Sequence, residues 1–533
     1  MFYDSSRLFL AGGTVEGVKR YKDLFEAKET YTPAELAFEK ARRTAGLFLG
    51  PILFLFFLIF PPFSLSTQAN RLVAVLALVL TFWITEAIPI PATALLGPAL
   101  MVVLGIGSVK EVFAPFADPV IWLFLGSFVL AEGMFVHGLN QRVAYGILSM
   151  KRIGSSASRI LFGYGAITCL LSMWLSNTAT TAMLYPIGMS ILVTLSGIVS
   201  QRKQQGVDIH HLRYGTALML IVAYASSIGG IGTPVGTPPN LIAISQLSKF
   251  VNIKIPFFQW MVIALPIMGI MFLVLFYYLK RACPPEIEEI PSSREFIEEE
   301  EKKLGEWTRG EKNCLFAFLF TVTLWVAPGF LAIIYGTESP VYSTYQKLIP
   351  EGVAALIGAA LLFLLPINWK ERQFTISWST AVNIDWGTIL LFGGGLSLGE
   401  FMFKTKLASA IGDGLISLTG VHSWWTITAL FALVSIIVTE TTSNTAAATM
   451  VCPLAIASAQ AAGVNPIAPA IASALGASMA FMLPISTPPN AIVYGSGCVP
   501  ITQMIRHGFI LDIISYIVVT VGVLFMCSLL GLH

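Results

Sequence analysis

Charged residues are scarce in this chain of 533 residues: Asp, Glu, Lys and Arg together make up 12%, whereas 55% of the residues are hydrophobic. A soluble domain carries about 25% charged residues. The composition therefore excludes an ordinary soluble protein and predicts a polytopic membrane protein. Because the net charge is only +2 and no basic stripe is present, we expect no nucleic-acid partner.

Patterned cysteine and histidine residues are also lacking. The six cysteines are scattered, mostly in apolar segments, and no CxxC or His-rich spacing occurs. We therefore expect neither a disulfide framework nor a metal centre of the Cys/His type. No His, Cys or Asp is placed to form a nucleophile–base pair, so the sequence predicts a protein that is not an enzyme and needs no cofactor.

A secretory leader is not recognisable at the N-terminus, because residues 1–43 are polar and charged and the first apolar run starts near residue 45. Apolar runs near the length of roughly 20 residues that crosses a bilayer follow. They lie near residues 45–60, 71–88, 92–106, 118–138, 257–280, 313–335, 350–366, 386–404 and 508–531.

Four further apolar regions are interrupted by Gly, Pro, Ser, Asn and Thr: residues 155–200, 213–250, 424–462 and 466–497. Interrupted helices at membrane depth are tolerated only where they are buried in protein or line a cavity. The hydrophilic stretch 281–312 predicts a cytoplasmic linker between two halves.

Lys and Arg in short loops predict the orientation. The positions placed inside are Arg142, Lys151, Arg152, Arg159, Arg202, Lys203, Arg213, Lys370 and Arg372. The segment 458–500 has no Lys or Arg and is placed outside. We expect a multi-pass protein of the cell membrane, with a cytoplasmic N-terminus and an external C-terminus.

An internal repeat links the interrupted regions. Ser176–Pro186 and Ser443–Pro453 both read S-N-T-A-x-x-x-M-x-x-P, 267 positions apart. A Phe-x-Gly motif followed by Glu recurs 268 positions apart, and "GTPPNLI" from Gly236 matches "STPPNAI" from Ser486, 250 positions apart. A single S-N-T is most simply a helix cap. Here the motif is duplicated in two interrupted segments that are predicted to enter the membrane from opposite sides. This arrangement indicates inverted repeats and a transporter binding site.

The chemistry of such a tip suits ions of both signs. A helix that ends there leaves free carbonyl groups, and a helix that begins there leaves free N–H groups. The prolines after Thr237 and Thr487 free further backbone groups. Residues 160–201 and 214–248 contain no charged residue, and 426–505 contain only Glu440. A site of dipoles and hydroxyls favours an anion whose charge is offset by co-bound Na⁺.

With these motifs the chain resembles the divalent anion:sodium symporter family, which includes sodium-coupled di- and tricarboxylate and sulfate transporters. The resemblance covers roughly residues 45–533 and rests on the paired S-N-T and T-P-P-N motifs. It implies an all-α elevator-type transporter with about 11 transmembrane helices and two re-entrant helical hairpins in two inverted repeats. It also implies a homodimer in the lipid bilayer.

The resemblance implies the site residues as well. The substrate would contact Asn177, Thr178, Thr237, Asn444, Thr445, Thr487 and Pro488. A first Na⁺ would be held by Ser172, Ser176, Asn177 and Gly236, with Gly230 and Gly232 as competitors of Gly236, and a second by Thr439, Thr442, Asn444 and Ser486.

Four acidic residues lie within apolar segments, where ionisable groups usually suggest function. For Glu86, Glu132 and Glu400 we expect packing or interfacial roles, with a structural role in both halves for the repeated pair Glu132 and Glu400. Glu440 could tune cation binding or pair within its own domain.

The predicted division follows the repeat. It comprises a cytoplasmic segment (1–44), two scaffold parts (45–154 and 313–423), two transport-domain parts (155–280 and 424–533) and the linker 281–312. The predicted function is Na⁺-coupled symport of a divalent anion, first a C4-dicarboxylate such as succinate. Sulfate or citrate symport, sodium-independent dicarboxylate exchange and an anion channel are the alternatives.

Overall fold

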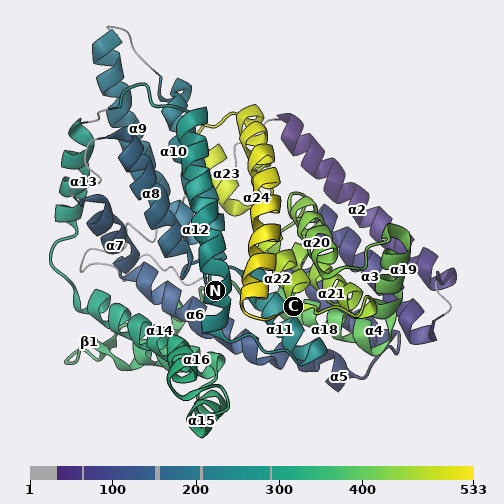
Figure 1. Cartoon of the computed structure of the whole chain (residues 1–533). Helices are drawn as coiled ribbons and strands as arrows, with labels where there is room; N and C mark the ends of the chain where they lie inside the picture. The colour runs from purple at the N-terminus through teal and green to yellow at the C-terminus, as the bar shows by residue number, and fades with distance from the viewer. Residues whose placement is uncertain (1–32, 63–64, 151–155, 204–207, 289–290, 533) are drawn as a thin grey trace, which may run out of the picture.

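The computed structural model describes residues 33–62, 65–150, 156–203, 208–288 and 291–532. The predicted cytoplasmic segment therefore lies outside the described residues up to position 32, as do Lys151 and Arg152. The described chain is almost entirely helical (Figure 1).

The first half contains α2 (Pro33–Ile59), α3 (Thr67–Thr85), α4 (Ile90–Val103), α5 (Val109–Phe113), η2 (Ala114–Ala117), α6 (Pro119–Val136), α7 (Leu139–Leu148), α8 (Ala157–Ser172), α9 (Asn177–Lys203), η3 (Ile209–His211), α10 (Arg213–Gly230), α11 (Pro238–Val251) and α12 (Phe257–Ala282). The predicted linker 281–312 contains α13 (Pro291–Lys303). The second half contains α14 (Arg309–Tyr335), α15 (Pro340–Leu348), α16 (Glu351–Leu364), β1 (Pro366–Asn368), β2 (Gln373–Phe374), α17 (Trp378–Ala381), α18 (Trp386–Lys404), α19 (Leu407–Thr419), α20 (Trp424–Thr439), α21 (Asn444–Ala461), α22 (Ile467–Gly476), α23 (Pro488–Tyr494) and α24 (Ile501–Leu529).

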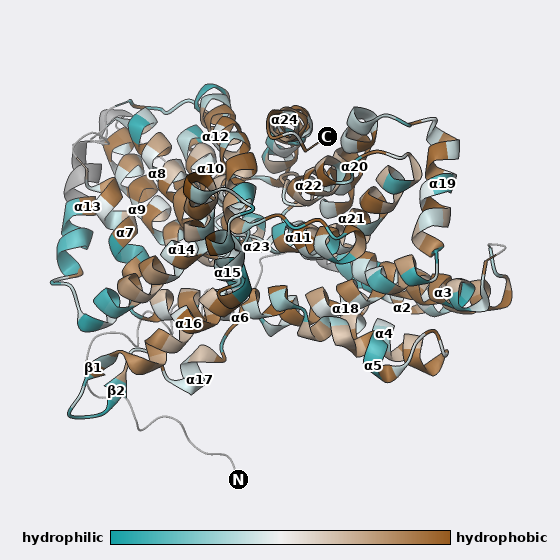
Figure 2. Cartoon of the chain, turned by 60° about the horizontal axis from the view of Figure 1, so that its bottom comes forward, coloured by the Kyte–Doolittle hydropathy of each residue, from teal (hydrophilic) through white to brown (hydrophobic). Residues whose placement is uncertain are grey.

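Apolar helices of membrane-spanning length dominate the fold. Among the described residues, eight helices are long and apolar enough to cross a bilayer, or up to ten if each of two bent pairs is one span. Figure 2 shows apolar residues along most helices, with polar residues at α13 and around β1 and β2. The protein is therefore an all-helical multi-pass membrane protein, and the short antiparallel pair β1–β2 is the one sheet among its described residues.

All four predicted interruptions are present. The helix pairs α8–α9, α10–α11, α20–α21 and α22–α23 are separated by residues 173–176, 231–237, 440–443 and 477–487. Sequence chemistry explains these breaks: Ser176 and Ser443 accept hydrogen bonds as caps of the next helix. In the other two breaks Pro occupies the first helical position after Thr237 and Thr487.

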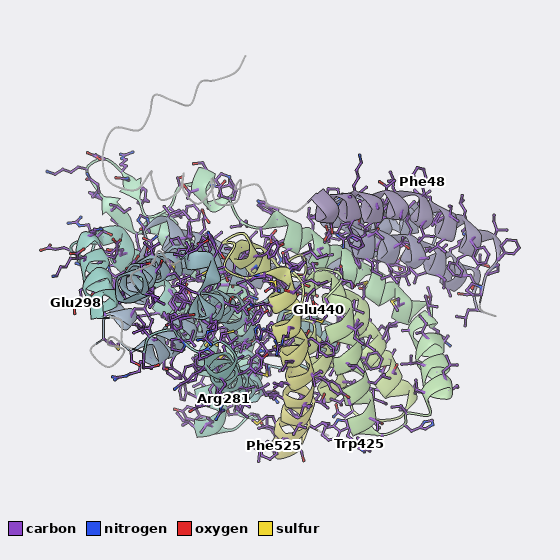
Figure 3. All side chains as sticks on the ribbon, turned by 90° about the horizontal axis from the view of Figure 1, so that it is seen from above. Phe48, Arg281, Glu298, Trp425, Glu440 and Phe525 are labelled. Atoms are coloured by element: carbon purple, nitrogen blue, oxygen red, sulfur yellow. The ribbon has the colours of Figure 1, made fainter. Side chains whose placement is uncertain are left out.

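Two short helices, α10 and α22, form the centre of the molecule. Every residue of α22, and every residue of α10 from Tyr214 onward, is buried. A helix that is apolar on all sides must be surrounded by other helices. At the other extreme, only 11% of the apolar window of α2 is buried, and Figure 3 shows its Phe48 pointing outward. Each central helix ends at one of the breaks, so the breaks lie inside the protein.

The repeated Phe-x-Gly motif packs against itself between the halves. The rings of Phe124 in α6 and Phe392 in α18 lie edge to face, with centroids 5.4 Å apart. The glycines of the same motif allow close helix approach: a Cβ on Gly126 would lie 2.5 Å from the carbonyl carbon of Ala355, and one on Gly394 would lie 2.1 Å from the Ala94 oxygen. The repeat therefore has a structural role, as expected in both halves for its Glu132 and Glu400, and the contacts of its Phe and Gly residues carry this role.

We predict that Gly126→Ala lowers the thermal stability of the purified protein, because the added methyl group meets backbone atoms that have no room to move. Overpacking of this kind costs about 1–3 kcal/mol. Thermal unfolding followed by intrinsic fluorescence in detergent measures the effect. The control is Gly146→Ala in α7, where nothing lies within 4 Å of the new methyl group. Equal transition temperatures for the two variants would refute the packing argument.

Candidate functional site

A single cavity of about 610 Å³ brings the two halves of the repeat together. It is lined by both S-N-T tips and by both Thr-Pro segments, from breaks that are far apart in the sequence. Its volume is typical of a small-molecule site. The lining residues from the S-N-T and Thr-Pro motifs are Ser176, Asn177, Thr178, Ala179, Gly236, Thr237, Pro238, Ser443, Asn444, Thr445, Ser486, Thr487, Pro488 and Pro489.

Six helices begin at this cavity: α9, α11, α21 and α23 from the repeated segments, and also α4 and α18. The N-terminus of a helix carries free N–H groups and a partial positive charge, which attract anions. Ser176 and Ser443 each accept one of these N–H groups at 3.2 Å. Thr237 and Thr487 hold extended backbone with φ near −148° and −144°, as residues before Pro do. The cavity is thus surrounded by positive helix ends.

The helices α8 and α10 end beside the same cavity and present carbonyl oxygens around Gly236. A Cβ on this glycine would lie 2.5 Å from the Gly230 oxygen, 2.9 Å from the Met173 oxygen and 3.0 Å from the Ser172 oxygen. Asn177 adds its Oδ1, which accepts a hydrogen bond from Ser172 at 2.7 Å. A space ringed by oxygens and kept open by a glycine suits a small cation.

The competing glycines fall into two groups. Gly230 belongs to the same ring of oxygens as Gly236 because its carbonyl faces that space, and its own α-carbon packs against Asn177 Oδ1. Gly232 instead packs against the side chains of Met268 and Met173. The geometry therefore favours Gly236 and Gly230 over Gly232 as parts of a cation site.

The second constellation lies where α20 and α22 end. The Thr439 hydroxyl lies 2.8 Å from Asn444 Oδ1 and 2.7 Å from the Ala477 oxygen, which matches the Ser172–Asn177 contact of the first half. The Ser486 hydroxyl lies within hydrogen-bond distance of the Glu440 carbonyl and carboxylate. Thr442 turns away, because its hydroxyl donates to the Trp83 carbonyl at 2.9 Å.

Two buried asparagines brace the Thr-Pro segments in the same way. Asn240 Nδ2 donates to the carbonyls of Gly230 and Thr233, and Asn490 Nδ2 donates to those of Ala480 and Leu483. These two sets of partners are each 250 positions apart, as are the asparagines themselves. The final residue of T-P-P-N therefore holds the unwound segment that precedes it, a role that the sequence analysis did not assign.

The structure gathers most of the predicted site residues. All seven predicted substrate residues line the cavity, as do Ser176, Gly236 and Ser486 of the predicted sodium ligands. Ser172 and Thr439 lie buried behind the two asparagines. That these residues bind substrate and Na⁺ stays a prediction, and Thr442 fits it least, since its hydroxyl is already engaged with α3.

Sequence reasoning missed the contribution of the segment before α18. Asn383, Asp385 and Thr388 line the cavity, and Asp385 caps α18 by accepting the Thr388 N–H at 3.0 Å. An acidic residue directly before an apolar run is a recognisable cap signal, but nothing in its spacing places it beside the repeats.

The intramembrane acids have different surroundings. Glu86 pairs with Arg42 and Arg43, and Glu400 pairs with Lys249 and Lys404 at 2.8 Å each, so both have the packing partners that we expected. Glu132, the counterpart of Glu400 in the repeat, lines the cavity instead. The cavity lining includes no Lys or Arg among the described residues.

Helix breaks from two repeats that enclose one cavity among membrane-spanning helices are the arrangement of a secondary transporter. Comparison with known proteins agrees. The family described as "Sodium:sulfate symporter transmembrane region" matches residues 42–532, and the chain belongs to this family. The similar proteins of this family are transporters and not enzymes.

Two relatives and one solved structure illustrate the similarity. The sodium-dependent dicarboxylate transporter SdcS of Staphylococcus saprophyticus is 36% identical over 485 residues, which cover 90% of this chain and 91% of the relative. SdcS of Staphylococcus aureus strain USA300 is 34% identical over 512 residues, 95% of each chain. MtrF of Neisseria gonorrhoeae, from a class of antimetabolite efflux pumps, shares the fold with a TM-score of 0.50 at 14% identity, over 80% of this chain and 83% of its own.

We predict that Gly236→Ala abolishes cation binding at the first constellation, because the methyl group occupies the space between the Gly230, Met173 and Ser172 oxygens. Binding of ²²Na⁺ to the purified protein measures the loss. The control, Gly269→Ala in α12, adds a methyl group into open space. If Gly236→Ala bound Na⁺ with the affinity of the control, the ring of oxygens would not be a cation site.

Proposed function

We propose that this protein is a secondary active transporter that couples Na⁺ to the uptake of a divalent anion, first a C4-dicarboxylate such as succinate. The observation that carries the proposal is the cavity itself: six helix N-termini lie around it, four of them from the repeats, and its described lining has no basic side chain and only two acidic ones, Glu132 and Asp385. An anion there must draw its countercharge from helix ends and from co-bound cations. The two sets of carbonyl and amide oxygens supply places for those cations.

The two asparagines would couple the ions. Asn177 and Asn444 each direct Oδ1 toward a buried hydroxyl on the cation side. Their Nδ2 groups are then left to donate to a carboxylate in the cavity, together with the Thr178 and Thr445 hydroxyls. A cation on each Oδ1 would fix the amide in this orientation. Two such tips facing one cavity match a substrate with an anionic group at each end.

The larger architecture is part of the proposal. We place the scaffold in residues 45–154 and 313–423 and the moving transport domain in 155–280 and 424–533, as two inverted repeats with about 11 spans and two re-entrant hairpins. The transport domain would carry the cavity across the membrane as an elevator within a homodimer. The protein would lie in the plasma membrane with its N-terminus in the cytoplasm and its C-terminus outside.

The named activity of the SdcS relatives, sodium-dependent dicarboxylate transport, supports succinate over the other anions. Sulfate is the second candidate because the family description names it. Citrate symport differs from the leading proposal in the charge of the substrate. Sodium-independent exchange differs from it in the driving ion.

We predict that reconstituted protein accumulates radiolabelled succinate only when an inward Na⁺ gradient is imposed. The physical reason is that the cavity's described lining offers no fixed positive charge to replace Na⁺. Uptake into proteoliposomes is measured with Na⁺ or K⁺ outside, with or without internal dicarboxylate, and in competition with sulfate or citrate. Uptake that ignores Na⁺ but requires internal dicarboxylate would establish exchange instead.

We also predict that Asn177→Ala and Asn444→Ala each reduce succinate uptake about 10- to 100-fold, since each removes one hydrogen bond to a charged group. The control Asn465→Ala removes an amide that caps α22 by accepting the Ile467 N–H. Size-exclusion profiles verify that the variants are folded. Wild-type uptake by either tip variant would remove the asparagines from the site.

A further inference from the structure

Two buried carboxyl groups lie behind the second constellation, outside the cavity. Glu440 directly follows α20 and Asp512 is in the middle of α24, and their exposed fractions are only 7% and 6%. The Asp512 carboxyl group lies beside that of Glu440. Figure 3 shows Glu440 in the interior, next to α24. Two adjacent acids in the apolar interior require a positive or protonic partner, because an unpaired buried charge costs several kcal/mol.

The two acids differ in the hydrogen-bond donors around them. Glu440 Oε1 accepts the backbone N–H groups of Phe481 at 2.6 Å and Met482 at 3.0 Å, and Oε2 lies 2.7 Å from the Ser486 hydroxyl. These two amide donors suit an ionised carboxylate. No hydrogen-bond donor lies in good geometry on either carboxyl oxygen of Asp512, whose polar neighbours include the Glu440 carboxyl group and the Phe481 N–H. Buried polar atoms without partners are rare in native proteins and mark sites that another group completes.

A second unpartnered atom lies on the same helix. The Ser515 hydroxyl is fully buried and has no hydrogen-bond partner, and residues three apart share one face of a helix. Tyr224, whose hydroxyl donates to the Phe481 carbonyl, is a neutral neighbour of both acids. Among the ion pairs formed within the described ranges, none includes Glu440 or Asp512, so no described basic side chain balances them.

The first half of the repeat has nothing equivalent. By the 267-residue offset, Met173 occupies the place of Glu440, and by the 250-residue offset Gly236 occupies the place of Ser486. The first constellation therefore ends in carbonyl oxygens around a glycine, whereas the second continues through the Ser486 hydroxyl to a pair of carboxyl groups. The asymmetry adds negative charge to one half only.

We propose that Glu440 and Asp512 bind a third sodium ion, with the Ser515 hydroxyl as a further ligand and the Ser486 hydroxyl linking this ion to the second constellation. A single positive charge matches the pair, since two amide donors already offset part of the Glu440 charge. Hard carboxylate and hydroxyl oxygens are the ligands that such a cation prefers. The inference rests on the proposed Na⁺ coupling and adds one ion to it.

The test counts sodium ions. Equilibrium dialysis with ²²Na⁺ and saturating succinate gives the ions bound per protomer for the full-length protein and for Asp512→Asn. We expect the wild type to bind three Na⁺, one at each of the two constellations and one at the pair of acids. Asp512→Asn should bind one Na⁺ fewer than the wild type. The control Asp413→Asn removes the same charge from an exposed position in α19 and should leave the count unchanged.

A shared proton is the competing occupant of the pair. Because Asn mimics a protonated Asp, Asp512→Asn would then bind as many sodium ions as the wild type, and the proposal would be overturned. A wild type that drives no Na⁺-dependent succinate uptake would instead refute the proposed function. The two failures are therefore distinguishable.

Ser515→Ala decides the matter if Asp512→Asn does not fold. Without a bound cation, removing a buried hydroxyl that has no partner should be neutral or stabilising. With one, the Na⁺ concentration for half-maximal succinate uptake should rise about fivefold, as expected for the loss of one neutral ligand. Ser458→Ala in α21 removes another buried, unpartnered hydroxyl and serves as the control. Equal Na⁺ dependence of the two serine variants would overturn the proposal.

Discussion

Backbone groups that are freed inside an apolar protein must find partners, and this requirement governs the whole molecule. Four pairs of helices among the membrane-spanning helices are each separated by a break. Each break leaves carbonyl and N–H groups without helical partners where water is scarce. Capping serines and the two bracing asparagines, Asn240 and Asn490, satisfy part of them. The remaining groups face one cavity or the spaces behind it, and we propose that ions are the partners that complete them.

The polarity of the helices sorts these ions. At each S-N-T tip one helix ends and the next begins within five residues, so carbonyls and N–H groups are exposed side by side with opposite partial charge. The carbonyl oxygens of Ser172 and Met173 lie around the space at Gly236, and the residues that begin the next helices line the cavity. In the proposed binding mode an anion and its cations lie close together, and each lowers the electrostatic cost of binding the other. Coupling of this kind needs no charged side chain at the tip.

Local sequence signals determined much of this arrangement. The breaks at Ser176 and Ser443, and those before Pro238 and Pro488, follow from cap and proline chemistry and were predicted, and the repeat indicated that they meet. What could not be predicted depends on contacts between distant segments. The sequence identifies Asp385 as a helix cap, but only the packing of α18 shows that it lines the cavity. Likewise, the contact between Phe124 and Phe392 of the repeated Phe-x-Gly motif is visible only in the structure. The same holds for Glu132 and Glu400, which share a motif but not an environment.

The two halves thus share a backbone plan but differ in charge. Identical hydrogen bonds recur at fixed offsets around Asn177 and Asn444 and around Asn240 and Asn490. Side chains that do not take part in these hydrogen bonds differ between the two halves. Behind the tips, Met173 corresponds to Glu440 and Gly236 corresponds to Ser486. Because Glu440 begins the second S-N-T break and hydrogen-bonds three residues of the break before α23, Phe481, Met482 and Ser486, we expect that whatever neutralises it also orders that half of the cavity. Under the proposed coupling, a cation therefore has the larger effect on the shape of the anion site in the second half, whereas the first half already has its ring of carbonyl oxygens without one.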